Sequence, residues 1–307
     1  MKNLTMTEAQ EIFRTHGLPW EHLQLSAVGF RNQVWMGETA VLKVYGDDNL
    51  AGGKLETWFY KIAQPAYAPK LLAAGQDGDW ILLERIYGTG LFRLWRDYSE
   101  EQREKAVIKI AEIALSVSQI PWSEDTQWIP VPADISAADF GAEFLCEVER
   151  LYCALSAQHA IKPELGARAM AYVQENIGVF DDRSLFLVYN DLHFDNLLVT
   201  EDGRMVLLDF EMLAIAPKDL VLDVWQRMLI HPFTYANEED HEHTHPCDYV
   251  HLLTWMKRYA PSLFSHPAVR KRVNLYGIRY EFDILQEYPM AEWPMERLEV
   301  YLREDLW

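Results

Sequence analysis

Residues 188–199 read VYNDLHFDNLLV, and they place two aspartates, two asparagines and a histidine inside an apolar pattern that is typical of a strand. A buried polar group without a partner costs about 1–3 kcal/mol. Such a cluster in a core-like segment therefore calls for chemistry that uses it. Carboxylate and amide oxygens can bind a hard cation, and a free carboxylate can accept a proton.

The chain after this cluster is predicted to return as a hairpin. Two apolar runs flank Asp202–Gly203, which is the strongest short signal for a type I′ turn. Counting outward from that turn predicts Asn196 opposite Asp209, on the same face of the pair. Asp191 then lies on the loop that enters the hairpin, five residues before Asn196.

This predicted arrangement suits a metal-assisted reaction. Asn196 and Asp209 can hold Mg²⁺ with phosphate oxygens and water as its other ligands. Asp191 can orient a hydroxyl group and accept its proton. The alternative is an ordinary loop whose Asn and Asp side chains cap turns.

The motif resembles the aminoglycoside phosphotransferase and choline kinase family, which has a protein-kinase-like fold. The usual form H-G-D-L-H-x-x-N, followed by D-[FW]-E, is similar to NDLHFDNLLV and LLDFE here. The resemblance implies that Asp191 is the catalytic carboxylate and that Asn196 and Asp209 bind Mg²⁺. The sequence departs from the family at Tyr189 and Asn190, where His and Gly are usual.

Glu211 stands where protein kinases have the glycine of D-F-G, which favours a small-molecule kinase over a protein kinase. Because Glu211 follows the metal-binding motif directly, it is also a candidate ligand for the substrate.

A kinase of this fold needs a lysine for the nucleotide phosphates and a glutamate that holds it. Lys43 lies in the apolar run AVLKVY, where a lysine can also serve only to protect an edge strand. A Gly-X turn at Gly37–Glu38 predicts Asn32 opposite Lys43. Glu56, in the following helical segment, is the expected partner of Lys43, unless it is a solvated helix residue.

Two nucleotide contacts are implied by the resemblance alone. The loop before Lys43 resembles the pattern G-x-x-N-x-V in Gly29, Asn32 and Val34. The segment WILLERIYGTGL resembles the hinge strand, so backbone groups from Glu84 to Ile86 are expected to meet adenine.

The last 80 residues are rich in acids and aromatics, and family members hold their substrates there. Carboxylates suit substrate amines, and aromatic faces suit a quaternary ammonium group. The candidates are Glu281, Asp283 and Glu287, with Tyr280 and Trp293. The alternative is that the aromatics form helix core and the acids a solvated face.

A second candidate metal site is the segment 241–247, where three histidines and Cys247 alternate with other residues. Its spacing matches no usual zinc pattern, so an exposed loop is the alternative.

Composition limits the partners. The formal net charge is −19, from 47 acidic and 28 basic residues. This excess argues against binding to nucleic acids or anionic membranes, since phosphates require a basic surface. It is compatible with a small cationic substrate, or with solubility alone. Three cysteines without a metal or redox spacing indicate a reducing compartment, and we expect a cytoplasmic protein with no transmembrane helix.

The elements that must position these residues follow from periodicity. Strand-like alternation dominates residues 24–46 and 70–86, and helical periodicity dominates most of the chain after residue 92. We expect an α+β, protein-kinase-like two-lobe fold, with a small antiparallel-sheet lobe at 1–86 and a larger, mostly helical lobe at 87–307.

The expected function is ATP-dependent phosphotransfer to the hydroxyl of a small, cationic molecule. The acceptor stays open among aminoglycosides, choline, amino sugars and related alcohols, as do GTP use and the oligomeric state. The alternative is a nucleotide-binding protein of the same fold that performs no phosphotransfer.

Overall fold

The computed structural model describes residues 4–26, 32–47, 49–63, 66–122, 140–181, 184–236 and 238–303. Within these ranges the chain forms two compact units. The first contains the described residues up to Leu94 together with Phe194–Leu213. The second contains Trp95–Trp122, the described residues from 140 to His193, and the chain from Ala214 onward. The predicted boundary between residues 86 and 87 stays a prediction.

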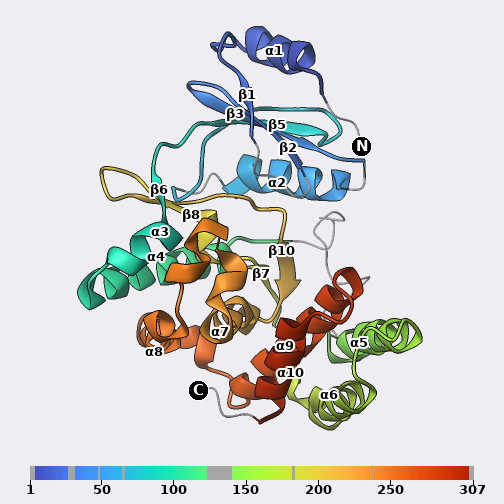
Figure 1. The fold of residues 1–307 in the computed structure, drawn as a ribbon. Helices are drawn as coiled ribbons and strands as arrows, with labels where there is room; N and C mark the ends of the chain where they lie inside the picture. The colour runs from blue at the N-terminus through green and yellow to red at the C-terminus, as the bar shows by residue number, and fades with distance from the viewer. Residues whose placement is uncertain are drawn as a thin grey trace. The chain divides into compact units, whose positions relative to one another are not determined.

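The first unit is built on a five-stranded antiparallel sheet of order β1-β2-β3-β5-β4 (Figure 1). Its strands are β1 (Gln24–Leu25), β2 (Asn32–Met36), β3 (Ala40–Tyr45), β4 (Leu71–Ala74) and β5 (Trp80–Glu84). Helices α1 (Met6–Thr15) and α2 (Leu50–Ala63) cover its two faces. The strands predicted within 24–46 and 70–86, and the helical segment that was expected to contain Glu56, are therefore confirmed.

The alternation of β3 divides its side chains between these two helices. Ala40, Leu42 and Val44 belong to the core that contains Ala9 and Phe13 of α1. Lys43 lies between them in sequence, so its side chain projects from the opposite face, toward α2. The period of two therefore puts the lysine on the α2 side of the sheet.

The first hairpin differs from its predicted register. Gly37 donates its backbone N–H to the carbonyl of Ala40 at 2.9 Å, which makes Glu38–Thr39 the centre of the turn. Lys43 therefore stands opposite Val34 instead of Asn32. Because the shift is by two residues, Asn32 still lies on the same face as Lys43, two pairs further along and opposite Tyr45.

A three-stranded sheet of β6 (Thr89–Gly90), β8 (Leu197–Val199) and β9 (Met205–Leu207) completes the first unit. The β8–β9 hairpin is also in a different register from the predicted one. Val199 pairs with Met205, so Asn196 continues toward Leu208, whose N–H donates to the Asn196 carbonyl at 2.8 Å. The prediction that Asn196 faces Asp209 is wrong by one residue.

The physical reason is the turn. Gly203 has φ +79°, and its N–H donates to the carbonyl of Thr200 at 2.9 Å. The loop between Thr200 and Arg204 therefore has three residues, with glycine in the left-handed position at its end. The Thr200 hydroxyl stabilises this loop by accepting the Arg204 N–H at 3.1 Å.

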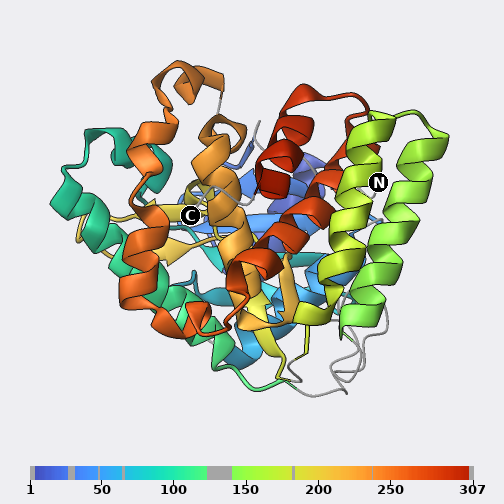
Figure 2. The ribbon, with the colours of Figure 1, turned by 90° about the horizontal axis from the view of Figure 1, so that it is seen from below.

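The second unit is mostly helical, as Figure 2 shows from below. Its α9 (Val269–Glu287) packs mainly against α5 (Phe140–Ala157), α7 (Leu222–Ile230) and α10 (Glu292–Arg303). The remaining helices are α4 (Glu100–Ser118), α6 (Pro163–Asn176) and α8 (Leu252–Tyr259), and α3 (Leu91–Asp97) spans the division between the units.

Strands β7 (Phe186–Tyr189) and β10 (Leu213–Ala216) pair in a two-stranded sheet. The polar segment that contains Asp191 follows β7 directly. Among the helices in the described ranges, none combines the length and the apolar composition needed to cross a bilayer.

Candidate active site

Lys43 is the centre of the polar cluster in the first unit. Its Nζ lies 2.8 Å from Glu56 Oε2, 2.9 Å from Asp209 Oδ1 and 3.7 Å from Glu211 Oε2. Glu56 is fully buried and Lys43 is 8% exposed. The expected pairing of Lys43 with Glu56 is present, and the interpretation of Lys43 as an edge-strand guard does not describe this buried lysine.

The protonation of Lys43 follows from these neighbours. Burial alone would lower the pKa of Lys43, but the charges of Glu56, Asp209 and Glu211 outweigh burial and raise the pKa above its usual value. Lys43 is therefore an ammonium group at neutral pH. It can bind an anionic ligand without first taking up a proton.

Glu56 links α2 to the segment after β9. Its Oε2 accepts hydrogen bonds from Lys43 and from the Tyr45 hydroxyl, and its Oε1 accepts the Phe210 N–H at 2.5 Å. The Phe210 ring stacks on Phe59 of α2, with ring centroids 4.3 Å apart. One buried carboxylate thus fixes β3, α2 and the Asp209–Glu211 segment together.

Asp209 has φ +62°, the left-handed region that few non-glycine residues adopt. Its Oδ1 also accepts the N–H of Glu211 at 3.3 Å, a local contact that helps an aspartate hold this conformation. This backbone turn, and not the hairpin register, brings Asp209 to Lys43.

Glu211 faces the same cluster. Its Oε2 accepts hydrogen bonds from Asn32 Nδ2 at 2.9 Å and from Asn49 Nδ2 at 2.7 Å. Asn49 also donates to Asn32 Oδ1 at 3.0 Å. Asn49 was not predicted, although its position just before α2, where Asn is a preferred cap, was a usable signal. Tyr45 was also missed, and nothing in its apolar run marked it.

The donor set of this cluster fits a hard divalent cation. Glu56, Asp209 and Glu211 offer carboxylate oxygens that lie within 4.8 Å of one another. Their three charges exceed the single charge of Lys43. Asp209 Oδ2 and Glu211 Oε1 accept no hydrogen bond from the described residues. Oxygen ligands with excess negative charge are what Mg²⁺ prefers.

Other predicted nucleotide and metal residues are placed as follows. Asn196 ends a short 3₁₀ turn, Phe194–Asn196, directly before β8. Glu84 ends β5, and the backbone amide of Ile86 has no hydrogen-bond partner among the described residues. Gly29 lies outside the residues that the structure describes. The roles assigned to these residues stay predictions.

Asp191 belongs to the second unit, in the turn after β7. Its Oδ2 lies 3.4 Å from His193 Nε2, and a third of its side chain is exposed (33%). The His193 ring packs against Tyr235, with centroids 5.0 Å apart. Trp225 donates its indole N–H to the Leu192 carbonyl at 2.8 Å, which anchors the turn to α7. The carboxylate is therefore held on a fixed backbone while remaining accessible.

The predicted substrate acids on α9 have different environments. Asp283 and Glu287 are exposed, whereas Glu281 is fully buried. Glu281 Oε1 lies 3.4 Å from Arg297 Nη1 and accepts the Tyr301 hydroxyl at 3.2 Å. Burial raises the pKa of Glu281 to about 7, and Arg297 opposes the rise. In this structure the Glu281 carboxylate is therefore bonded to residues in the interior of the second unit.

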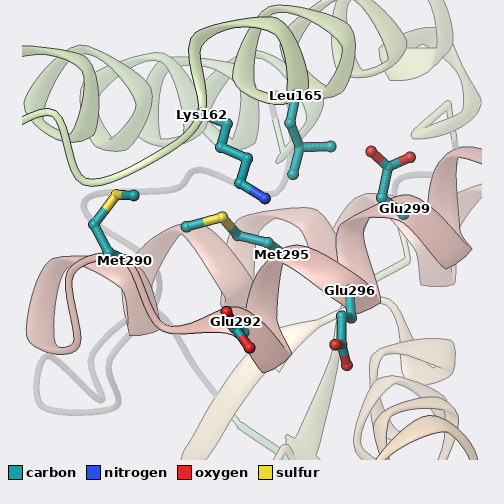
Figure 3. Close-up of a pocket in the computed structure, with 7 residues that line it drawn as sticks. All are labelled: Lys162, Leu165, Met290, Glu292, Met295, Glu296 and Glu299. Atoms are coloured by element: carbon teal, nitrogen blue, oxygen red, sulfur yellow. The ribbon is translucent and has the colours of Figure 1, made fainter.

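The second unit also contains a pocket of about 360 Å³ between α6 and α10. It is lined by Lys162, Leu165, Met290, Glu292, Met295, Glu296 and Glu299 (Figure 3). Glu296 bonds to His231 at 2.9 Å and Glu299 to Arg168 at 3.0 Å, so contacts within the unit account for two of its three carboxylates.

The histidine segment forms no metal cluster among the described residues. His241, His243, His245 and Cys247 are all exposed, and the only group of three possible ligands found in the described ranges is Glu56, Asp209 and Glu211.

A comparison with known protein families gives one match. The sequence profile described as the phosphotransferase enzyme family matches residues 22–225, which is more than half of the chain. The chain belongs to the phosphotransferase enzyme family. The predicted family and the predicted enzyme class, a phosphotransferase, are therefore confirmed. A comparison with curated proteins finds no significant match.

Solved structures share the fold of this phosphotransferase. Aminoglycoside phosphotransferase APH(4)-Ia is 16% identical with a TM-score of 0.67, and the match covers 98% of this chain and 99% of that chain. A ternary complex of APH(2'')-IIa with streptomycin and ATP is 15% identical with a TM-score of 0.66, over 99% and 97% of the chains. Choline kinase from Cryptosporidium parvum Iowa II is 14% identical with a TM-score of 0.63, over 98% and 95%. The α+β, protein-kinase-like fold is thus confirmed.

Proposed function

We propose that this phosphotransferase transfers the terminal phosphate of ATP to the hydroxyl group of a small, cationic molecule. The observation that carries the proposal is Lys43, held as an ammonium group between Glu56 and Asp209 at 2.8 and 2.9 Å. A buried, permanently charged lysine beside a set of carboxylate oxygens suits a metal-bound polyphosphate.

Each residue of the cluster has a proposed role. Lys43 binds phosphate oxygens of the nucleotide, and Glu56 holds Lys43 in place. Asn196 and Asp209 hold Mg²⁺, which when bound neutralises charge on the phosphate being transferred. Glu211 either supports Asp209 or contacts the substrate.

Asp191 is the proposed catalytic carboxylate. It orients the acceptor hydroxyl and takes its proton on a carboxylate oxygen as the new O–P bond forms. It precedes Asn196 by five positions along the chain, so their Cα atoms cannot be more than about 18 Å apart.

The nucleotide would meet the first unit at two further places. The backbone amide of Ile86, which has no partner in the described part of the chain, would bind adenine with the Glu84 carbonyl, and the loop with Gly29 and Asn32 would cover the phosphates. Support for ATP as the donor comes from the similar fold of a structure that contains ATP with APH(2'')-IIa.

A cationic acceptor is supported by the formal net charge of −19 and by neighbours whose names include streptomycin and choline. The exposed carboxylates of Asp283 and Glu287 remain the proposed amine ligands. Glu281 stays with them as a proposal, although its carboxylate is bonded to Arg297 and Tyr301.

The proposal is tested with Asp191→Asn. A screen of ATP consumption across aminoglycosides, choline, amino sugars and homoserine first identifies an acceptor for the wild type. We then expect the variant to bind Mg-ATP with unchanged affinity and to lose at least about 10²-fold in kcat. Asp195→Asn, the same change at an exposed aspartate of the same segment, is the matched control and should keep its turnover.

Wild-type turnover in Asp191→Asn would remove the proposed base. The departure at Tyr189 and Asn190 favours one second candidate, a nucleotide-binding protein without phosphotransfer. That candidate is supported if Mg-ATP stabilises the wild type against heat while no hydroxyl compound in the screen is phosphorylated.

A further inference from the structure

A second pocket in the first unit lies away from the Lys43 cluster, where the end of α2 meets β4, β5 and the β8–β9 turn. Its volume is about 480 Å³, which is within the usual range for small-ligand sites. Its lining includes Lys61, Lys70, Arg204 and Glu84, with Tyr60 as a buried wall. The proposed function uses none of the three basic side chains.

The walls of this pocket are fixed by backbone hydrogen bonds. The N–H of Glu84 donates to the Lys70 carbonyl at 2.9 Å, and the N–H of Leu207 donates to the Tyr67 carbonyl at 2.7 Å. These bonds tie the segment before β4 to β5 on one side and to β9 on the other. The Tyr60 ring packs edge-on against Phe210, with centroids 5.3 Å apart. The pocket is therefore formed before any ligand arrives, which lowers the entropy cost of binding.

The charge of the pocket opposes that of the chain. Three cations and the single carboxylate of Glu84 give its lining a net charge of +2 at neutral pH, in a protein whose formal net charge is −19. Among the described residues, none of these three cations forms an ion pair. Lys61 lies in the last turn of α2, where a cation complements the helix dipole. Arg204 interacts electrostatically with Asp202, whereas Lys70 has no such explanation.

We propose that this pocket binds a small anion that carries two or more phosphate groups. Lysine and arginine are the side chains that recognise phosphate, arginine through paired N–H donors and lysine as a point charge. Lys70 and Arg204 come from different elements and line the same space, so one ligand can meet both. Lys61 adds a third contact from α2. The three cations differ from the residues proposed to bind the ATP phosphates, because the pocket contains neither Lys43 nor Asp209, although the Glu84 that lines it is also the residue whose backbone carbonyl is proposed to meet adenine.

The test is a calorimetric titration of inorganic pyrophosphate into the full chain, with the Lys70→Ala, Arg204→Ala double variant. All three cations are exposed, so the double variant is expected to fold, and its thermal unfolding checks this. We expect its affinity for pyrophosphate to fall at least about tenfold. Lys54→Ala removes an exposed lysine of α2 that does not line the pocket and should bind as the wild type does.

Lys43→Ala separates this proposal from the proposed function. If pyrophosphate occupies the new pocket, Lys43→Ala retains a binding event that the double variant lacks, whether or not ATP is the donor. If binding is lost in Lys43→Ala and unchanged in the double variant, pyrophosphate enters only the Lys43 cluster and the proposal is overturned. Absence of any binding to the wild type at millimolar pyrophosphate overturns it as well.

Discussion

Whether a buried side chain of this phosphotransferase is ionised depends on its immediate partners. Lys43 stays charged because three carboxylates outweigh the cost of its burial. Glu281 has two cationic neighbours, Arg297 and Arg227, but also lies near Asp223, and burial is its largest influence. The two residues are both buried, and the balance of neighbouring charges gives them opposite outcomes: one keeps its charge, and the other loses it near neutral pH.

The stability of the second unit should therefore depend on Glu281 near neutral pH. A carboxyl group whose folded-state pKa is raised to about 7 binds a proton more tightly in the folded state. Its contribution to stability is present below its unfolded pKa and is lost as pH rises through about 7. Relative to Glu281→Gln, the free energy of unfolding of the wild type should fall by up to about 3 kcal/mol between about pH 5 and pH 8.

Urea denaturation of both proteins across this range measures the effect. Asp283→Asn, which changes an exposed acid on the same helix, is the control for loss of a carboxyl group. A constant difference for Glu281→Gln would show that Glu281 does not titrate there.

Elements in the first unit are positioned by close backbone contacts as much as by side chains. Gly53 of α2 is packed so tightly that an added Cβ would lie 1.9 Å from the Gly78 carbonyl oxygen and 2.6 Å from the Tyr45 ring. Glu56 follows Gly53 by one helical turn. The approach of α2 to the sheet therefore sets where the partner of Lys43 lies.

Gly53→Ala tests this contact. Helix propensity alone would stabilise the variant by up to about 1 kcal/mol, because alanine is the better helix former. The clash should reverse that sign and cost about 1–3 kcal/mol, since the Gly78 backbone cannot move as a flexible side chain can. Gly90→Ala is the control, because an added Cβ there meets nothing within 4 Å. Chemical denaturation compares the two, and a gain in stability for Gly53→Ala would contradict the packing argument.

The registers of the β2–β3 and β8–β9 hairpins were not predicted correctly from the sequence. The strands themselves were predicted from alternation, but both turns were assigned the wrong central residues. Asp202–Gly203 was interpreted as a two-residue turn, whereas Thr200 closes a three-residue loop with its side chain. Two-residue and three-residue loops contain the same kinds of residue, and the choice between them depends on contacts that form only after folding.

At the scale of the whole molecule, charge is the dominant property. The formal net charge is −19, and the excess acidic groups repel one another most strongly in the compact folded state. Screening by salt should therefore stabilise the protein. Raising NaCl from about 10 mM to about 200 mM shortens the screening length from about 30 Å to below about 10 Å.

We expect this change in salt to raise Tm by a few degrees, and KCl should have the same effect if screening is the cause. Differential scanning calorimetry at matched pH measures the shift. A Tm that is unchanged, or that falls in both salts, would show that long-range repulsion does not limit the stability of this chain.

The sequence by itself determined the chemistry-bearing residues of this protein. The spacing of Asp191, Asn196 and Asp209 predicted the family, and the alternation of β3 put Lys43 on the face toward α2. These features are local, because they depend on residue type, spacing and a period of two. Tertiary structure decided which partners those residues have. The ion pair of Asp209 with Lys43, the contacts of Glu211 with Asn32 and Asn49, and the burial of Glu281 all depend on segments that are distant in sequence. No local pattern encodes such contacts, because their energies exist only once the chain has packed.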